Sequence, residues 1–251
     1  MKAAISWSGG KDAWLAWRRG GAQGLDVDTF VTMCDAAGAT LAHALPTEWI
    51  QGQVAALEGV GEGAVEPASW CVPVGPEGYA AAFDAVLARL RAQGCEAMVF
   101  GDIDLAAHRD WIAPRVQAQG LRAVFPLWGH ARRALAGELL ASGVRARVVC
   151  VDERRLDAAF CGRDYDAAFL RDIPAEVCPC GEDGEFHTFV HGGPGFARTL
   201  ELVNGPRRRV ASRPPLPPGN FTLQAFAGTA PWVAGPSTAQ AAHAAPSITA
   251  P

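Results

Sequence analysis

Apolar and polar residues alternate along the first half of the chain in blocks with the lengths of strands and helices. Helical spacing is clearest over 79–93, where Phe83, Val86, Leu87 and Leu90 share one face. Short apolar or β-branched runs predict strands at 3–6, 29–33, 71–74, 97–100 and 123–127. Helical patterns lie between or after them, at 13–19, 48–57, 79–93, 108–119 and 132–141. This alternation predicts an α/β fold of the Rossmann-like type, a parallel sheet with helices on both faces.

The pattern changes in the second half of the chain. A strong strand is expected at 147–151, followed by short helical pieces and by weaker strands over 198–213 and 221–226. From about residue 214 the composition shifts to Pro, Ala, Gly, Ser and Thr, and disorder is expected beyond about 233. We therefore predict three parts: a nucleotide-binding domain (1–124), a smaller C-terminal α/β lobe that holds a second substrate (125–213), and a largely irregular tail (214–251).

The first predicted strand leads into a glycine turn with the features of a phosphate-binding loop. Residues 8–12 read Ser-Gly-Gly-Lys-Asp, and a helix is expected to follow until Gly20 and Gly21 end it. Adjacent glycines let the backbone approach an anion with its N–H groups pointing inward. The first turn of the helix adds N–H groups and the positive end of its dipole. The predicted nucleotide-binding residues are Ser6, Ser8, Gly9, Gly10, Lys11 and Asp12, with Lys11 supplying a charge that acts in catalysis.

Two familiar nucleotide motifs do not fit this loop. A Walker loop has a longer glycine spacing and a Lys-Ser/Thr ending, and the dinucleotide fingerprint is Gly-x-Gly-x-x-Gly. Neither pattern occurs at residues 5–13. The alternative to a nucleotide site is a tight structural turn between strand and helix.

Gly101 and Asp102 follow the buried strand predicted at 97–100. Ligands in open parallel sheets bind at the carboxyl ends of strands, where the glycine loop also lies. We therefore expect both residues beside the nucleotide, with Asp102 as a ligand of Mg²⁺, which prefers carboxylate oxygens. Asp104 and Arg109 are weaker candidates for the metal and for phosphate. The alternative for Asp102 is a structural cap on the next helix.

A second cluster of reactive residue types lies between 178 and 191. It reads Cys-Pro-Cys-Gly-Glu-Asp-Gly-Glu-Phe-His-Thr-Phe-Val-His, and its glycines allow turns that present the side chains together. A carboxylate can take a proton from an attacking amine or bind an ammonium ion, and histidine titrates near neutral pH. The candidate catalytic residues are Glu182, Glu185 and His187.

The cysteines and the last histidine of this cluster have plainer explanations. Cys178 and Cys180 are closer together than the usual zinc-binding pair, and no second pair follows them. A nucleophilic role for Cys180 stays open, but small buried residues beside a turn are the simpler interpretation. His191 is expected to be an ordinary loop histidine.

Composition narrows the possible classes of protein. The chain has 251 residues, of which 49% are hydrophobic and 19% charged, as in globular proteins. A net charge of −4 makes nucleic acid an improbable partner, and the short basic run at 207–209 is expected to be a solvated turn. No apolar stretch is long enough to span a membrane, and residues 1–12 lack a secretory apolar core. Seven scattered cysteines then favour a reduced, cytoplasmic protein.

Four segments together resemble the diphthine–ammonia ligase family, whose members are PP-loop ATP pyrophosphatases with an adenine nucleotide alpha hydrolase-like (HUP-like) domain. They are Ser-Trp-Ser-Gly-Gly-Lys-Asp at 6–12, Phe-Gly-Asp-Ile at 100–103, Phe-Pro-Leu-Trp-Gly at 125–129 and Cys-Gly-Glu-Asp-Gly-Glu-Phe-His-Thr-Phe at 180–189. The resemblance covers roughly residues 2–200.

The resemblance implies an enzyme that uses ATP, Mg²⁺ and ammonia to form an amide on a carboxylate-bearing substrate, free or on a protein. Residues 8–11 would hold the departing pyrophosphate, and Glu182 and Glu185 would position or deprotonate ammonia. His43, in the only stretch similar to the family's histidine-glycine segment, would approach the nucleotide; the alternative is a surface loop. Ala13 departs from the pattern, because serine is usual there and its hydroxyl contact to phosphate is lost.

Two other functions remain open at this stage. One is a PP-loop sulfur transferase that acts on RNA, although the acidic net charge and the lack of a Cys-x-x-Cys pair weigh against it. The other is a non-catalytic adenine-nucleotide-binding protein, which the alanine at position 13 favours slightly. A homodimer is possible under any of the three.

Overall fold

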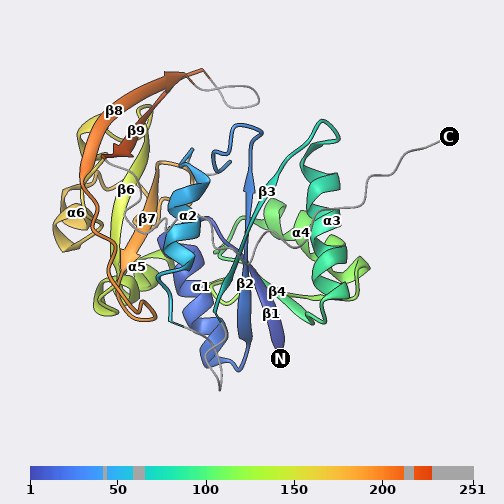
Figure 1. Cartoon of the computed structure of the whole chain (residues 1–251). Coiled ribbons are helices and arrows are strands. Elements are labelled where there is room, and N and C mark those ends of the chain that lie inside the picture. Colours follow the sequence, from blue (N-terminus) through green and yellow to red (C-terminus); the bar gives the residue numbers. More distant parts are fainter. Residues whose placement is uncertain (42–43, 59–65, 212–217, 228–251) are drawn as a thin grey trace.

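The computed structural model describes residues 1–41, 44–58, 66–211 and 218–227, and within them the first half of the chain forms a parallel sheet (Figure 1). Its strand order is β3-β2-β1-β4-β5, and every pairing is parallel. The strands are β1 (Lys2–Ser6), β2 (Asp26–Cys34), β3 (Ala68–Pro73), β4 (Ala97–Val99) and β5 (Arg122–Val124). The helices are α1 (Lys11–Ala22), α2 (Thr47–Val54), α3 (Gly78–Ala92) and α4 (Ala106–Ala118). The predicted α/β fold with a parallel sheet is confirmed.

Alternate residues of the strands face two different cores, as the period of two in a β-strand requires. Ala3 and Ile5 of β1 pack in the core that includes α1 and α2, whereas Ala4 packs with α3 and α4. Figure 1 shows the resulting layers: α1 and α2 lie between the parallel sheet and a second sheet, and α3 and α4 cover the opposite face.

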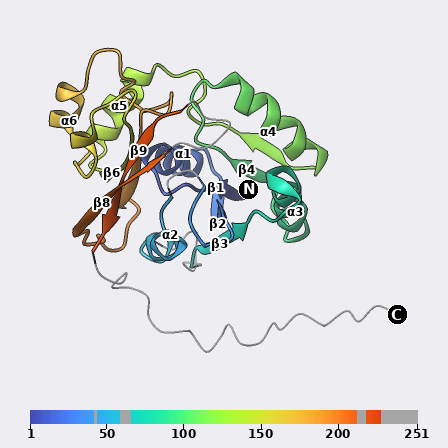
Figure 2. The same cartoon turned by 90° about the horizontal axis from the view of Figure 1, so that it is seen from above.

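The second sheet is antiparallel, with the order β7-β6-β9-β8 (Figure 2). Its strands are β6 (Arg145–Asp152), β7 (Phe186–Gly192), β8 (Asn204–Ala211) and β9 (Asn220–Phe226), accompanied by α5 (Arg132–Ala141), the 3₁₀ turn η1 (Ala158–Phe160) and α6 (Ala167–Asp172). The strand expected at 221–226 is confirmed as β9, which lies between β6 and β8, so this part of the predicted tail completes the sheet.

β7 brings the second sheet against the glycine loop. Val190 donates its backbone N–H to the carbonyl oxygen of Gly9 at 2.9 Å, and Ala56 and Leu57 after α2 pair with residues 196–197. Apolar side chains of α1, α2, β6 and β7 form one continuous buried cluster. The segment that leads into β7 therefore lies at the carboxyl end of the parallel strands, beside the glycine loop.

Several local predictions need correction. Gly20 and Gly21 lie inside α1 instead of ending it, and Gly24, with φ +82°, follows the helix. A Cβ on Gly20 would make only ordinary van der Waals contacts, the nearest of them 3.4 Å from Leu25 Cδ1. The helix expected at 108–119 is α4, and Pro114 lies in its second half.

The later part of the chain holds more strand than expected. His191 belongs to β7 rather than to a loop, and the arginines at 207–209 lie in β8 rather than in a turn. Residues beyond 227, including the stretch expected to be disordered, fall outside the described part. Within the described ranges, no helix combines the length and apolar character needed to cross a bilayer.

Candidate functional site

A cavity of about 400 Å³ opens where the glycine loop meets the second sheet. Three segments line it: residues 6–13 at the start of α1, residues 101–108 after β4, and residues 180–188 at the start of β7. The structure brings most of the predicted site residues to this cavity, namely Ser6, Ser8, Gly10, Lys11, Asp12, Gly101, Asp102, Glu182 and His187. Gly9 and Glu185 lie behind its walls, and His43 falls outside the described residues.

The glycine loop is held in shape by buried hydrogen bonds. Gln53 of α2 is fully buried; its Nε2 donates to the carbonyl oxygens of Gly9 and Val190, and its Oε1 accepts from Trp7 Nε1 at 2.8 Å. Gly9 adopts φ +79°, and a Cβ there would lie 2.7 Å from Ile50 Cδ1. Glycine is therefore required at position 9 for both its backbone conformation and its packing.

The start of α1 lines the cavity with backbone N–H groups that have no partner within the helix. The N–H of Gly10 donates to Ser8 Oγ at 3.3 Å, and the N–H of Lys11 donates to Thr188 Oγ1 at 3.1 Å. The first N–H groups of a helix have no partner within the helix, which leaves those of Asp12 and Ala13. Both residues line the cavity, so the helix N-terminus can bind an anion there.

Gly101 allows the segment after β4 to approach this helix turn closely. A Cβ at position 101 would lie 3.0 Å from the backbone nitrogen of Ala13 and from the carbonyl carbon of Asp12. Any larger residue would push the β4–α4 segment away from the start of α1. The glycine thus explains how Asp102 comes to line the same cavity.

Lys11 links the glycine loop to the segment before β7. Its side chain is 2% exposed, and its Nζ donates to Asp12 Oδ2 at 2.8 Å and to the carbonyl oxygen of Cys180. The rings of Tyr165 and Phe186 lie 5.5 and 5.3 Å from this nitrogen. Burial works to lower the pKa of Lys11, but nearby acidic groups, Asp12 first among them, outweigh it and the pKa is raised. Lys11 is therefore a stable cation in the wall of the cavity.

Two carboxylates near the first turn of α1, those of Asp12 and Asp102, have the chemistry that Mg²⁺ binds. Asp102 Oδ1 lies 2.9 Å from His108 Nδ1, and this hydrogen bond raises the pKa of His108. Asp12 Oδ1 is buried and has no hydrogen-bond partner in the described part of the chain. The described residues hold no ready cluster of three or more His, Cys, Asp or Glu side chains for a metal. Mg²⁺ usually binds only one or two carboxylates, and phosphates and water complete its coordination. Asp12 and Asp102 would supply the two carboxylates.

Glu182 lines the cavity from the 180–188 segment, across from the segment that follows β4. Its Oε1 accepts a hydrogen bond from the backbone N–H of Ile103 at 3.2 Å, so the two lobes meet at this side chain. Burial raises the pKa of Glu182 to about 7 against the opposing effects of Ile103 and Lys11. Near neutral pH the carboxyl group can therefore gain or lose a proton, as a general acid or base must.

Glu185 holds the loop that carries Glu182. It is 2% exposed, and its carboxylate accepts hydrogen bonds from the backbone N–H groups of Cys178 at 3.0 Å and Asp183 at 3.1 Å. Arg155 lies 4.0 Å from the same carboxylate. These contacts favour a structural role, and the predicted catalytic role of Glu185 gains no support from its position.

His187 lines the cavity beside Thr188. Burial, together with the charge of Lys11, lowers its pKa to about 4. The imidazole is thus neutral at physiological pH and suits hydrogen bonding better than donation of a proton from an imidazolium. His191, farther along β7, contacts the carbonyl oxygen of Leu200 at 3.2 Å and does not line the cavity.

The two cysteines of the cluster are buried and free. Cys180 lines the cavity, and its Sγ donates to the carbonyl oxygen of Arg132 at 3.2 Å. A hydrogen bond between the two side chains lowers the pKa of Cys178 and raises that of Cys180. A thiol with a raised pKa is a poor nucleophile, so the position of Cys180 does not favour covalent catalysis. Arg109, a candidate phosphate ligand, lies instead over the ring of Trp128 at 4.7 Å.

Two family models match the chain over most of its length. The model described as diphthamide synthase N-terminal domain matches residues 1–123, and that described as diphthamide synthase C-terminal domain matches residues 133–212. The chain belongs to the diphthamide synthase family. Membership supports a PP-loop enzyme that uses ATP.

A solved structure from Methanocaldococcus jannaschii, described as a predicted subunit of tRNA methyltransferase, is also similar. It is 14% identical, covers 77% of this chain and 98% of its own, and gives a TM-score of 0.41. Comparison with curated proteins gives no match.

Sequence reasoning missed four residues of this diphthamide synthase family site. Gln53, Thr188, His108 and Arg132 contact or support the predicted residues, yet no motif marks Gln53, His108 or Arg132. Thr188 lies within the quoted 180–189 segment and carried the best available signal, next to His187. His108 lies six residues from its partner Asp102, whereas Gln53 lies 44 residues from Gly9 and approaches it only through folding.

Proposed function

We propose that this protein is an ATP-dependent ligase that converts a substrate carboxylate into an amide with ammonia. A carboxylate oxygen attacks the α-phosphorus of ATP, the bond to the bridging oxygen breaks, and pyrophosphate leaves. The nitrogen of ammonia then attacks the acyl carbon, AMP leaves with the bonding electrons, and the nitrogen loses a proton. The products are an amide, AMP and pyrophosphate.

One observation carries this proposal: the anion-binding turn of α1 and the side chain of Glu182 face the same cavity. The N–H groups of Asp12 and Ala13 and the cation of Lys11 suit the charge that develops on departing pyrophosphate. Bound Mg²⁺ would supply further neutralisation of the phosphate oxygens. This wall accounts for the first half of the reaction.

Glu182 accounts for the second half. As a carboxylate with a pKa of about 7, it accepts the proton that ammonia loses on attack. Asp102, hydrogen-bonded to His108, lies in the same cavity and assists with metal or phosphate. Ala13 supplies its backbone N–H but no hydroxyl, so phosphate binding here depends more heavily on the backbone.

The test is a product analysis with ATP, Mg²⁺, ammonium and a panel of carboxylates. We expect AMP and pyrophosphate in equal amounts, together with an amide, from the wild-type protein. Lys11→Ala is expected to abolish turnover. Glu182→Gln should slow amide formation by about 100-fold while ATP still binds, since general base catalysis contributes on this order. The matched control is Glu201→Gln, because Glu201 is exposed and outside the cavity.

Other outcomes would redirect the proposal. Phosphate and ADP in place of AMP and pyrophosphate would exclude attack on the α-phosphorus. Tight ATP binding without turnover on any carboxylate would favour the non-catalytic nucleotide-binding function. Sulfur incorporation into RNA that depends on Cys180 would favour the sulfur transferase.

A further inference from the structure

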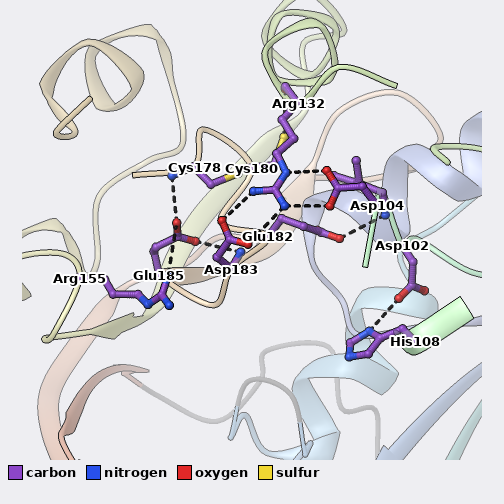
Figure 3. A network of polar contacts seen from close by, with 11 residues as sticks. Asp102, Asp104, His108, Arg132, Arg155, Cys178, Cys180, Glu182, Asp183 and Glu185 are labelled. Carbon is purple, nitrogen blue, oxygen red and sulfur yellow. Dashed lines mark hydrogen bonds and ion pairs between the residues drawn. The ribbon is translucent and has the colours of Figure 1, made fainter. Parts of the chain in front are cut away.

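Arg132, the first residue of α5, binds two carboxylates from distant parts of the chain (Figure 3). Its Nε and Nη2 each donate to the Asp104 carboxylate at 2.8 Å. Its Nη1 and Nη2 donate to the Asp183 carboxylate at 2.7 and 3.2 Å. Within the described residues, neither aspartate has another ion-pair partner.

The two aspartates lie directly beside the contact that joins the walls of the cavity. Asp104 follows Ile103, whose N–H donates to Glu182 Oε1, and Asp183 follows Glu182 itself. Both sides of the Ile103–Glu182 hydrogen bond are therefore tied to one guanidinium group. A planar guanidinium can serve two carboxylates at once in a way that an ammonium cannot.

The backbone of Arg132 contributes a further tie to the same segment. Its carbonyl oxygen accepts the hydrogen bond from Cys180 Sγ, and the carbonyl of Cys180 accepts from Lys11 Nζ. The segment from Cys180 to Asp183 is thus held at both ends, by the glycine loop's lysine and by Arg132. Glu182 lies between these two points.

We infer that Arg132 is a positioning residue that holds Glu182 against the β4–α4 segment and so keeps it aimed into the nucleotide cavity. This inference rests on the proposed function for its catalytic consequence, but its structural part stands independently. Arg132 does not line the cavity, so it acts through Glu182 and not on substrate. Exposed ion pairs add little to overall stability, and the Asp104 and Asp183 side chains are 40% and 41% exposed. Substitution of Arg132 should therefore change the position of Glu182 more than the overall stability of the protein.

The pKa of Glu182 distinguishes positioning from a simple charge effect. Removing a nearby positive charge would by itself raise the pKa of a carboxyl group. Releasing Glu182 into water would lower it, because burial is the largest cause of its raised pKa and outweighs the lost bond to Ile103. A fall in this pKa on substitution of Arg132 is thus specific to positioning.

The experiment measures this pKa by NMR titration of glutamate side-chain carboxyl carbons in the full chain, with Glu182→Gln used for assignment. In Arg132→Gln we expect the pKa of Glu182 to fall from about 7 toward the usual glutamate range. Arg132→Lys should restore part of the shift. The matched control is Arg133→Gln, the next residue of α5, which has no ion pair among the described residues and should leave the pKa unchanged.

Steady-state kinetics supply the catalytic part of the test. Arg132→Gln should reduce kcat by about 10-fold or more, with the KM for ATP changed by less than about threefold, because the phosphate-binding wall is intact. A Glu182 pKa that rises or stays constant in a folded Arg132→Gln protein would overturn the inference. If the pKa falls but no AMP forms even in the wild type, the proposed function fails while the positioning role holds.

Discussion

The glycine loop on one wall of the cavity and the segment 180–188 on the other bring polar groups to the same space by different means. The loop presents backbone N–H groups, which its neighbours fix through fully buried contacts such as those of Gln53. The 180–188 segment presents an ionisable side chain, Glu182, which is fixed by partly exposed ion pairs of Arg132.

Because one wall presents backbone groups and the other an ionisable side chain, the two walls should differ in their sensitivity to pH and salt. Backbone donors keep their character at every ordinary pH, and buried hydrogen bonds are little affected by salt. Carboxylates and exposed ion pairs respond to both pH and ionic strength. Binding of the phosphates should therefore be robust, whereas the chemistry assigned to Glu182 should vary with conditions. Substitutions on each wall can test whether this division holds.

The largest effect is expected for Gln53→Leu on the loop side. Leucine has a similar volume but leaves Trp7 Nε1–H and the carbonyl oxygen of Val190 buried without these partners. Each unsatisfied buried group costs about 1–3 kcal/mol, so we expect a loss of roughly 2–5 kcal/mol in the free energy of unfolding. Urea unfolding measures it, with exposed Gln117→Leu as the control, which should change stability by less than about 0.5 kcal/mol. A loss at Gln53 no larger than the control would show that this side chain does not hold the loop.

A smaller loss is expected for Gly9→Ala. The new methyl group meets Ile50 Cδ1 at 2.7 Å, and alanine disfavours φ +79°. Strain at a positive φ costs about 1–2 kcal/mol and overpacking a similar amount, so the unfolding free energy should fall by roughly 2–3 kcal/mol. ATP affinity should fall with it, as calorimetry would show.

The control for Gly9→Ala is a glycine of α1, the helix that follows the loop. Gly21 is inside α1 with open space around a would-be Cβ, so Gly21→Ala should stabilise the protein by up to about 1 kcal/mol. Equal responses at the two positions would mean that the loop tolerates rearrangement. The glycine loop would then not be the rigidly held wall of the cavity.

The two walls also differ in how far the sequence predicts them. The Ser-Gly-Gly-Lys-Asp loop combines a turn, a helix start and a charge within five residues, so local geometry alone indicated an anion site. Gly101 and Asp102 followed from the rule that ligands bind at the carboxyl ends of parallel strands. Glu182 was indicated by its residue type and its glycine neighbours.

The contacts that hold these residues were not predictable. Arg132 binds Asp104 and Asp183, which are 28 and 51 residues away, and no local pattern marks such a pairing. Glu185 has the same residue type and glycine-rich surroundings as Glu182, yet it turns inward to backbone N–H groups. A strand at 221–226 was expected, but its place between β6 and β8 was not, because both partners come from other parts of the chain.

The smallest expected effect tests the ionisable wall through the pH dependence of stability. The pKa of Glu182 is about 7 in the folded protein, above the ordinary glutamate value of 4.5. A raised folded pKa means that the stability contribution is complete below about pH 4.5 and is lost as the pH rises through 7. Glu182→Gln removes this loss, so the variant should gain stability relative to wild type between pH 5 and pH 8. We expect a gain of roughly 1 kcal/mol, since partial exposure of the side chain screens the effect.

Urea unfolding of both proteins at pH 5, 6, 7 and 8 measures this gain. Glu201→Gln, at an exposed position, should show no pH-dependent difference from wild type. Gln53→Leu should show the same loss at every pH, because no titrating group takes part in its contacts. If the stability difference between Glu182→Gln and wild type did not vary with pH, while that of Gln53→Leu did, the roles assigned to the two walls would be reversed. The expected pattern would instead place the titrating group on the 180–188 side of the cavity and the pH-independent contacts on the loop side.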